Sequence, residues 1–317
     1  MLEVEGLVKH FPVSGKRGSV VHAVDDVSFS VGAGKTLGLV GESGCGKSTV
    51  ARTIIRMYEP TAGSIRIDGI EIAHMKERQL RPIRPKIQMI FQDPASSLND
   101  RMTIGEVLAE PLIAQRIVRS VREGRELITD ILEAVGLSAQ HIGRYPHEFS
   151  GGQRQRIGIA RALILNPQVI IADEAISALD VSVQAQVINL LRDIQEQHEI
   201  TYLFIAHDLA MVRHVSDQVG VMYLGQLVEL SESEEIYQNP LHPYTQGLLR
   251  AVPAADPFTK RARTEASIDG DIPSPIEPPS GCRFRTRCPL AQEVCAAVVP
   301  EMRDVGGGHR VACHMVA

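Results

Sequence analysis

One run of eight residues constrains this chain more than any other: Gly41-Glu-Ser-Gly-Cys-Gly-Lys-Ser48 fits the pattern G-x-x-x-x-G-K-[ST]. Its glycines let backbone N–H groups turn inward around an anion, while Lys47 suits β- and γ-phosphates and the Ser48 hydroxyl suits Mg²⁺. Thr36–Val40 is predicted as a buried strand and Lys47 to about Met57 as a helix, whose positive dipole end would face the phosphates. The sequence therefore predicts a nucleoside-triphosphate site that comprises Gly41, Ser43, Gly44, Cys45, Gly46, Lys47, Ser48 and Thr49.

Composition indicates an ordinary soluble globular protein. The chain has 317 residues, of which 44% are hydrophobic and 22% are charged. Its formal charge of −5 argues against a nucleic-acid partner, because such a partner usually requires a basic surface. No apolar run reaches the roughly 18 residues that span a bilayer, and no signal peptide opens the chain. Any role at a membrane is therefore expected to depend on partner chains.

Hydrophobic patterning predicts an α/β fold with a mixed sheet core, an antiparallel β subdomain and a helical subdomain. From about residue 93 to 150 the pattern becomes helical, as at Ile104–Leu112 and at Glu126–Val135, which Gly136 ends. Short continuous apolar runs indicate parallel strands, and more polar segments around the turn Asp68-Gly69 indicate antiparallel ones. The parallel set is Leu37–Val40, Val169–Ile171 and Leu203–Ile205, and the antiparallel set is Leu2–Val8, Val20–Val31 and Ser64–Asp68.

The chain changes character after Leu230. Two short helical stretches are followed by a proline-rich linker and then by four of the five cysteines. We expect a nucleotide-binding domain at residues 1–235, with its helical subdomain at about 93–150, and a C-terminal extension at residues 236–317. The linker prolines are Pro253, Pro257, Pro273, Pro275, Pro278 and Pro279.

A second acidic motif, Ile170-Ile-Ala-Asp-Glu174, ends a predicted strand. Beside a phosphate loop, Asp173 is placed to hold Mg²⁺, and Glu174 is placed to polarise the attacking water as a general base. Two acids that cap the next helix are the structural alternative. The strand in front of them and the phosphate loop elsewhere in the chain favour the catalytic interpretation.

Ser150-Gly-Gly-Gln153 predicts a helix start, because Ser150 and Gln153 have the spacing of a capping box. Two glycines exceed what a cap needs, and they leave the backbone bare for an anion at the helix dipole. Since the phosphate loop already serves the chain's own nucleotide, Ser150, Gly151, Gly152 and Gln153 are expected to meet a phosphate held by a partner subunit.

With these motifs the chain resembles the ATPases of ATP-binding cassette (ABC) transporters, whose signature reads Ser-Gly-Gly-Gln. The resemblance implies the fold of a P-loop NTPase cassette, and it implies ATP and Mg²⁺ as ligands. It assigns Gln92 to the metal and the attacking water, Asp180 to a loop that faces the opposite subunit, and His207 to the γ-phosphate. Phe11 would stack on adenine, with an ordinary core phenylalanine as the alternative. Ala175 stands where the family often has proline, and no loss of activity is expected from this departure.

Asn239-Pro-Leu-His-Pro-Tyr-Thr-Gln-Gly-Leu-Leu249 resembles the C-terminal motif of oligopeptide and dipeptide importer ATPases. The implied protein powers import of peptides from the cytoplasmic face of the cell membrane. It would act with a second ATPase subunit, identical or paralogous, two permease subunits and an extracytoplasmic binding protein. His242 is interpreted as the residue before a helix that begins at Pro243.

Two other interpretations stay open. The same machinery could import another solute, such as a nickel chelate or an opine. A soluble cassette ATPase acting on nucleic acid is less favoured, because it would usually carry a long coiled coil between the phosphate loop and the signature, and no heptads occur there. A ribosome-acting cassette protein is less favoured, because such proteins usually carry two cassettes and this chain has one. A small-molecule P-loop kinase is not favoured, because such a kinase would lack the Ser-Gly-Gly-Gln motif that this chain has at residues 150–153.

Four cysteines are crowded into the C-terminal part of the chain, with the spacing C-x₅-C-x₆-C-x₁₇-C. Four thiolates suit Zn²⁺ or an iron–sulfur cluster, and the wide gaps are unlike the C-x₂-C pairs of zinc ribbons. Similar quartets in some peptide-importer ATPases carry a [4Fe–4S] cluster, which is the preferred expectation, with Zn²⁺ and no metal as alternatives. The quartet is Cys282, Cys288, Cys295 and Cys313, and it is accompanied by Arg283, Arg285, Arg287 and Arg310.

Overall fold

The computed structural model describes residues 1–15, 18–93, 97–177, 179–251 and 270–316, so the linker residues Pro253 and Pro257 lie outside the described residues. The chain divides into two compact units. Unit 1 comprises residues 1–2, 31–35 and 74–205, and unit 2 comprises residues 3–30, 36–73 and 206–317. The predicted division at residue 235 is a different one, drawn from sequence motifs, and it stays a prediction.

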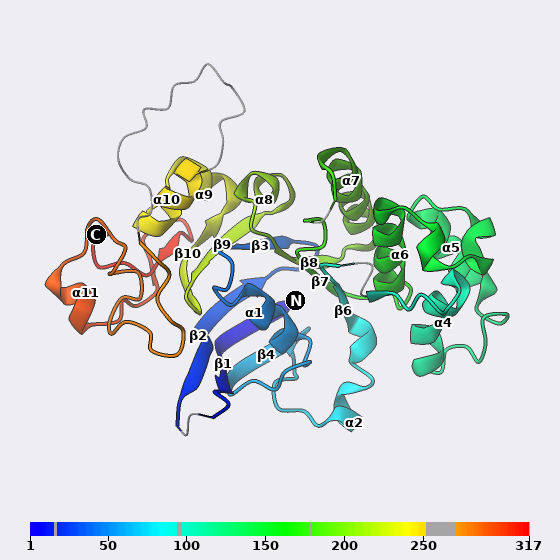
Figure 1. The fold of residues 1–317 in the computed structure, drawn as a ribbon, viewed down its shortest axis with the longest axis horizontal. Coiled ribbons are helices and arrows are strands. Elements are labelled where there is room, and N and C mark those ends of the chain that lie inside the picture. Colours follow the sequence, from blue (N-terminus) through cyan, green and yellow to red (C-terminus); the bar gives the residue numbers. More distant parts are fainter. Residues whose placement is uncertain (16–17, 94–96, 178, 252–269, 317) are drawn as a thin grey trace, which may run out of the picture. The chain divides into compact units, whose positions relative to one another are not determined.

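The N-terminal part of unit 2 is a four-stranded sheet in the order β2-β1-β4-β5 (Figure 1). The last two strands are antiparallel, and the predicted turn Asp68-Gly69 joins them. Both turn residues have positive φ, 52° and 76°, as the tight hairpin turn requires. The strands are β1 (Leu2–Pro12), β2 (Val20–Val31), β4 (Ala62–Ile67) and β5 (Ile70–Glu71).

A second, mixed group of strands in unit 2 carries the phosphate loop. The fully buried β3 (Thr36–Val40) runs parallel to β9 (Gln218–Tyr223), and β10 (Gln226–Glu232) pairs with β9 in the antiparallel sense. The short strands β12 (Arg310–Val311) and β11 (Arg303–Asp304) extend this group beyond β10. Tail strands are thus part of the sheet that positions the loop.

Helix α1 (Lys47–Ile54) follows the phosphate loop and ends earlier than the predicted Met57. The N–H of Met57 donates to the Arg52 carbonyl at 2.9 Å, and that of Arg56 donates to the Thr53 carbonyl at 3.0 Å. This is the Schellman arrangement, with Arg56 at φ 58° in the position that glycine usually occupies. The prediction overshot because no glycine marks this end.

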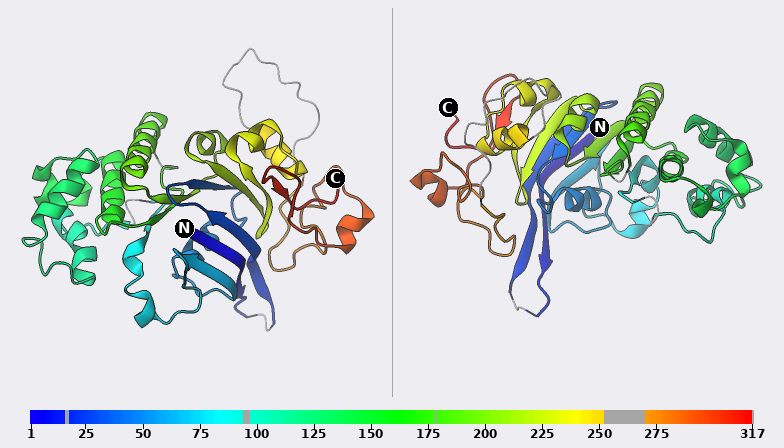
Figure 2. Two further views of the ribbon diagram at one scale, coloured as in Figure 1. Left: turned by 180° about the vertical axis from the view of Figure 1, so that it is seen from behind. Right: turned by 45° about the horizontal axis from the view of Figure 1, so that its top comes forward.

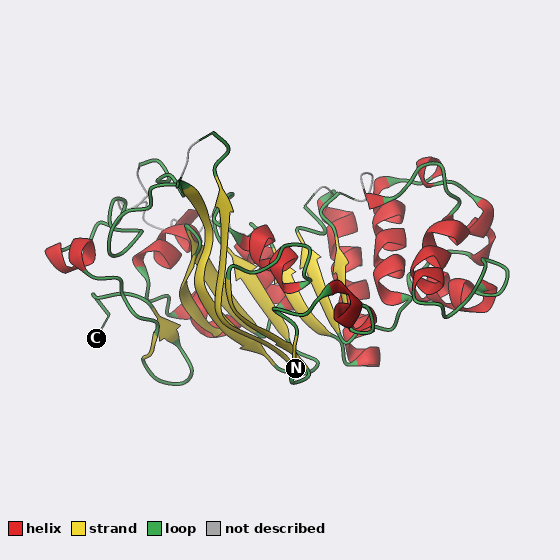
Figure 3. Cartoon of the chain, turned by 90° about the horizontal axis from the view of Figure 1, so that it is seen from below, coloured by secondary structure: helices red, strands yellow, loops and turns green. Residues whose placement is uncertain are grey.

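Unit 1 combines three parallel strands with a helix-rich segment, which Figure 3 shows as red ribbons beside the yellow strands. Strand β7 (Val169–Asp173) pairs with β6 (Ile87–Ile90) on one side and with β8 (Thr201–Ile205) on the other. Strands β7 and β8 are buried at every residue, as continuous apolar runs predict. The helices are α2 (Glu77–Leu80), α4 (Ile104–Ala114), α5 (Arg125–Ala134), α6 (Gly151–Leu163) and α7 (Val181–His198), with 3-10 turns η1 (Arg84–Lys86), η2 (Ala139–Gly143) and η3 (Pro146–Glu148).

Helix α10 (Pro243–Ala251) begins at Pro243 as predicted. The N–H of Tyr244 donates to Nδ1 of His242 at 3.1 Å, and burial lowers the pKa of His242 to about 3. A neutral imidazole at this position accepts a hydrogen bond at the helix start, and this agrees with the interpretation that His242 precedes a helix. The remaining helices are α8 (Leu209–Val215), α9 (Ser233–Gln238) and α11 (Glu293–Ala297), and Figure 2 shows their chain segments from two further sides.

A buried carboxylate joins the tail to β10. Glu229 has no exposed surface, and its two oxygens accept the N–H groups of Leu241 and His242 at 2.7 and 3.0 Å. His309, which is 4% exposed, completes the set with Nε2 at 2.7 Å from the same carboxylate. Such a charge is tolerated inside a fold because every oxygen has a partner. Among the residues described, no helix combines the length and the hydrophobicity that crossing a bilayer requires.

We expect Glu229→Gln to lower the free energy of unfolding by about 2–4 kcal/mol. The glutamine NH₂ would replace one of the two oxygens that accept backbone N–H groups, so that two hydrogen-bond donors would face each other. Urea unfolding followed by circular dichroism measures this. The exposed Glu232→Gln at the end of the same strand is the matched control and should change stability by less than about 0.5 kcal/mol. Equal stability of the two variants would contradict this account of the tail's attachment.

Candidate functional site

The phosphate loop of unit 2 encloses a buried lysine and lies tightly against neighbouring strands. Lys47 is 4% exposed, and its Nζ donates to the carbonyls of Gly41 at 2.7 Å and Glu42 at 3.1 Å. A Cβ on Gly41 would lie 2.2 Å from the Met222 carbonyl, and one on Gly46 would lie 2.2 Å from the Ala23 carbonyl. Only glycine fits these two positions, so the loop backbone lies directly against its neighbours.

The acidic motif lies at the end of a buried strand in unit 1. Asp173 is the last residue of β7 and is 2% exposed. Glu174 follows at φ 47°, a left-handed conformation that a glutamate rarely adopts, and its N–H donates to the Ile205 carbonyl at 2.9 Å. The amide of Gln92 donates to the Glu174 carboxylate at 2.6 Å. Two residues that the resemblance assigns to catalysis, 82 positions apart, therefore contact each other.

The signature segment starts α6 with the predicted capping box. The Ser150 hydroxyl accepts the Gln153 N–H at 3.3 Å, and the Gln153 side chain accepts the Ser150 N–H at 3.1 Å. A Cβ on Gly152 would lie 2.6 Å from the Val183 side chain, whereas one on Gly151 would meet nothing closer than Leu179 at 4.0 Å. Packing against α7 therefore explains Gly152, and Gly151 is the glycine that leaves exposed backbone at the helix N-terminus.

Three further residues suggested by the resemblance occupy distinct local settings. Asp180 caps α7, because its carboxylate accepts the Val183 N–H at 3.0 Å, and hydrogen bonds from Ser182 and Val183 lower its pKa. His207 is exposed and follows β8 by two residues. Phe11 packs edge-on against Tyr58 with ring centroids 5.2 Å apart. Their contributions to a nucleotide site remain predictions.

The cysteine quartet lies entirely in unit 2. The N–H of Cys282 donates to the Cys295 carbonyl at 2.8 Å, which ties the first and third members together. Burial raises the pKa of Cys282 to about 11, and nearby Cys295, Cys288 and Cys313 add to this shift. A zinc tetrahedron with Zn–S bonds of 2.3 Å requires sulfurs about 3.8 Å apart. Of the residues described, no three cysteines bring their sulfurs within 4.8 Å of one another.

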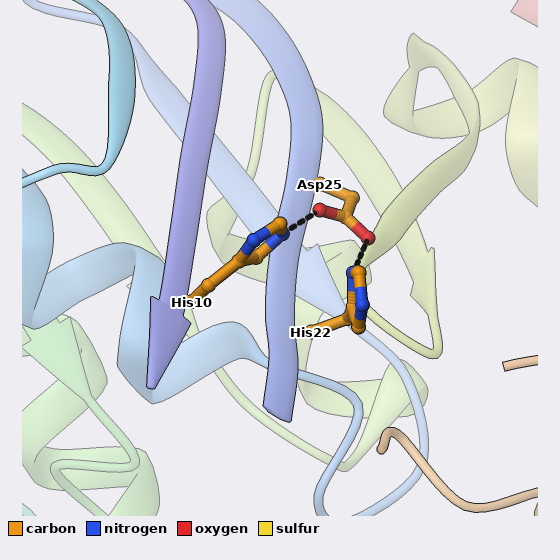
Figure 4. Close-up of side chains that lie close together, drawn as sticks. All are labelled: His10, His22 and Asp25. Atoms are coloured by element: carbon orange, nitrogen blue, oxygen red, sulfur yellow. Dashed lines mark hydrogen bonds and ion pairs between the residues drawn. The ribbon is translucent and has the colours of Figure 1, made fainter. Parts of the chain in front are cut away.

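His10, His22 and Asp25 bring their ligand atoms within 4.8 Å of one another, an arrangement that could hold a metal ion (Figure 4). The Asp25 carboxylate contacts Nε2 of His10, and Nδ1 of His22 lies 3.0 Å from its other oxygen. Arg283 donates to that same oxygen. Burial alone would raise the pKa of Asp25, but the hydrogen bonds from His10 and Arg283 outweigh it and lower this pKa. Because the guanidinium already neutralises the carboxylate, we interpret the group as an ion-pair network.

Sequence reasoning missed contacts between the tail and the phosphate loop. Arg287 forms two hydrogen bonds with Glu42 of the loop, at 2.7 and 2.9 Å. The Glu42 N–H also donates to the Tyr244 hydroxyl at 2.9 Å. Tyr244 lies in the Asn239–Leu249 motif, which resembles that of peptide importer ATPases but for which the sequence indicated no chemical role. The only sequence signal for Arg287 was its place among the arginines around the cysteines.

Comparisons with known proteins agree with the motifs. The family model for ABC transporters matches residues 24–177, and that for the oligopeptide/dipeptide transporter C-terminal region matches residues 228–295. The chain is 52% identical over 320 residues to the oligopeptide transport ATP-binding protein AppF of Bacillus subtilis. That alignment covers 99% of this chain and 97% of the relative.

Solved structures show the same fold. The ATP-binding cassette MJ0796, a dimer in a post-hydrolysis state with ADP and Pi, is 28% identical with a TM-score of 0.66, over 74% of this chain and 99% of that one. CbiO1 from Clostridium perfringens, part of the transporter complex cbiONQ, is 25% identical with a TM-score of 0.65, over 75% of this chain and 90% of that one. The predicted cassette fold with its mixed sheet and its C-terminal region is confirmed.

The two signature glycines should respond differently to alanine. We expect Gly152→Ala to lower the free energy of unfolding by about 1–3 kcal/mol, because its methyl group would overlap Val183. Gly151→Ala should fold normally and reduce ATP hydrolysis at least about 10-fold, since the methyl group would cover backbone needed for an anion. Thermal unfolding and phosphate release measure the two effects. Normal hydrolysis by folded Gly151→Ala would remove this residue from the anion site.

Proposed function

Because the chain belongs to the family of ABC transporter ATP-binding proteins with the oligopeptide/dipeptide transporter C-terminal region, we propose that it hydrolyses ATP to power peptide import. The observation that carries this proposal is the phosphate loop in a chain that also pairs Gln92 with Glu174. The family membership supports ATP and Mg²⁺ as ligands. A relative named as an oligopeptide transport protein, matched over nearly its whole length, supports the peptide cargo.

In this proposal each motif has one task toward ATP. Backbone N–H groups of the loop and the Lys47 ammonium bind the phosphates, while Ser48, Gln92 and Asp173 hold Mg²⁺. When held by these residues, Mg²⁺ would supply neutralisation of the negative charge on the phosphate oxygens. Glu174 would take a proton from water as the water oxygen bonds to the γ-phosphorus and the bond from that phosphorus to the β–γ bridging oxygen breaks, releasing ADP and phosphate. The hydrogen bond from Gln92 would orient the Glu174 carboxylate. The remaining proposed contacts are Gly41, Ser43, Gly44, Cys45, Gly46 and Thr49 at the phosphates, His207 at the γ-phosphate and Phe11 at adenine.

We propose that a complete site requires two cassettes. Ser150–Gln153 presents a capped helix start with exposed backbone at Gly151, which suits a phosphate bound by the other subunit. Asp180 would face that subunit as well. A solved relative of this fold is a dimer, which supports the arrangement. Release of the γ-phosphate would then open the pair, as in other switches that depend on this group.

The proposed transporter contains this chain, a second cassette that is identical or paralogous, two membrane permeases and an extracytoplasmic peptide-binding protein. The chain would bind the permeases from the cytoplasmic face of the membrane. In the proposed division, residues 1–235 provide the nucleotide-binding domain and residues 236–317 the importer-specific extension. The match of the C-terminal family model to residues 228–295 supports an extension of this kind.

We further propose that Cys282, Cys288, Cys295 and Cys313 hold a [4Fe–4S] cluster. Four cysteines are the usual ligand set of such a cluster, and their gaps in the sequence are wider than the C-x₂-C pairs of zinc ribbons. The cluster would convert four thiols into metal ligands and hold the tail together. Deprotonation is required for binding, and the raised pKa of Cys282 describes the thiol without metal.

We expect Glu174→Gln to bind ATP normally and to hydrolyse it at least about 100-fold more slowly, because the base is lost while the phosphate loop remains. ATP binding by calorimetry and phosphate release measure the two parts. In cells that lack the native gene, the unaltered chain should restore uptake of a labelled peptide and Glu174→Gln should not. Near-normal hydrolysis by the variant would exclude Glu174 as the base, and peptide uptake independent of the chain would exclude the transport function.

Metal analysis of protein purified without oxygen tests the cluster. We expect about four irons per chain and a brown colour, both lost in a variant with serine at Cys288. Replacing Cys45, which lies in the phosphate loop outside the quartet, should leave the iron content unchanged. One zinc per chain would favour the alternative, and neither metal would contradict both.

A further inference from the structure

We propose that Arg287 is a positioning residue for ATP binding: from the cysteine-bearing segment Cys282–Cys288 it holds the phosphate loop in place through Glu42. The inference rests on the proposed ATPase function and adds to it a role for the tail. In this proposal Arg287 does not itself bind the phosphates of ATP. It acts on the loop backbone through one partly buried ion pair.

The ion pair has the geometry of a strong, directional contact. Both terminal nitrogens of Arg287 donate to Glu42, one to each carboxylate oxygen, at 2.7 and 2.9 Å. The Arg287 side chain is 5% exposed and that of Glu42 is 25% exposed. A bidentate arginine–carboxylate pair fixes orientation as well as distance.

Glu42 transmits this contact to the loop through its main chain. Its N–H donates to the hydroxyl of Tyr244, a residue with no exposed surface, and its carbonyl accepts the Lys47 ammonium at 3.1 Å. Tyr244 is itself fixed in an aromatic cluster, with ring centroids 4.8 Å from Tyr223 and 5.4 Å from Phe284. The side chain, the N–H and the carbonyl of one loop residue are therefore all held.

A second arginine fixes the other end of the segment. Arg283 donates to the Leu224 carbonyl in the turn between β9 and β10, and to Asp25 on β2. The next residue in that turn, Gly225, donates its N–H to the Cys45 carbonyl of the loop at 2.8 Å. Since Arg283 follows Cys282 and Arg287 precedes Cys288, both anchors belong to the segment that carries the first two cysteines. Order in this segment is thereby linked to order in the phosphate loop.

Loss of the pair should weaken ATP binding more than the chemical step. The residues assigned to proton transfer and to the metal are all present in an Arg287 variant, so kcat should change little. If the loop becomes ordered only when MgATP binds, part of the binding free energy offsets the entropy cost of ordering it, and the affinity for MgATP falls. The expected signature is therefore a raised KM and Kd for MgATP with a nearly unchanged kcat.

The test compares Arg287→Gln, Glu42→Gln and the double variant in the full-length protein. We expect each single variant to raise KM and Kd for MgATP about 5- to 30-fold with kcat within about 3-fold, and the double variant to be no worse than either single one. Arg285→Gln is the matched control: it lies in the same segment but bonds to the Ser280 carbonyl at 2.8 Å, and it should bind ATP normally. Hydrogen exchange of the amides of residues 41–46 should rise in the variants and not in the control.

Unchanged KM, Kd and exchange in folded Arg287→Gln and Glu42→Gln would overturn the inference, as would effects that simply add in the double variant. If Arg287→Gln fails to fold, Glu42→Gln tests the same pair from its more exposed partner. Absence of ATP hydrolysis by the unaltered protein with its partner cassette would instead refute the proposed function. The two failures are therefore distinguishable in one set of assays.

Discussion

Two backbone carbonyl oxygens, those of Ala23 and Met222, determine how the phosphate loop can be built. Each would lie 2.2 Å from a Cβ on the loop glycine that faces it, so Gly46 and Gly41 are sterically required. Met222 belongs to β9, which pairs with β3 and β10, and Ala23 belongs to β2, which pairs with β1. Because these strands are held by sheet hydrogen bonds, the loop must fit against them without side chains at positions 41 and 46.

Unit 1 shows strain where the proposed chemistry needs orientation. Glu174 adopts a positive φ immediately after a buried strand, a conformation that costs about 1–3 kcal/mol for such a residue. Its N–H is tied to the Ile205 carbonyl, and its carboxylate receives the Gln92 amide. The backbone conformation and the two hydrogen bonds thus fix Glu174 at the end of β7, and its role as the base stays a prediction.

The C-terminal extension is integrated into unit 2 by buried polar contacts as well as by apolar packing. His309 reaches the fully buried Glu229, and Phe284 packs against Tyr223 and Tyr244. A tail held this way transmits its own order to the loop through Arg287 and Glu42. The Asn239–Leu249 motif thus acquires a physical role, because the Tyr244 hydroxyl accepts a hydrogen bond from a loop N–H.

The sequence by itself determined what depends on neighbours along the chain: the loop glycines before α1, the buried strands, and the capping box of Ser150 with Gln153. Propensity, periodicity and capping act within a few residues, so they can be predicted locally. Only the tertiary structure decided the pairing of Glu42 with Arg287, 245 positions apart, and the packing of Gly152 on Val183. Local sequence patterns do not encode such contacts, because they form only when elements far apart in the sequence pack against one another.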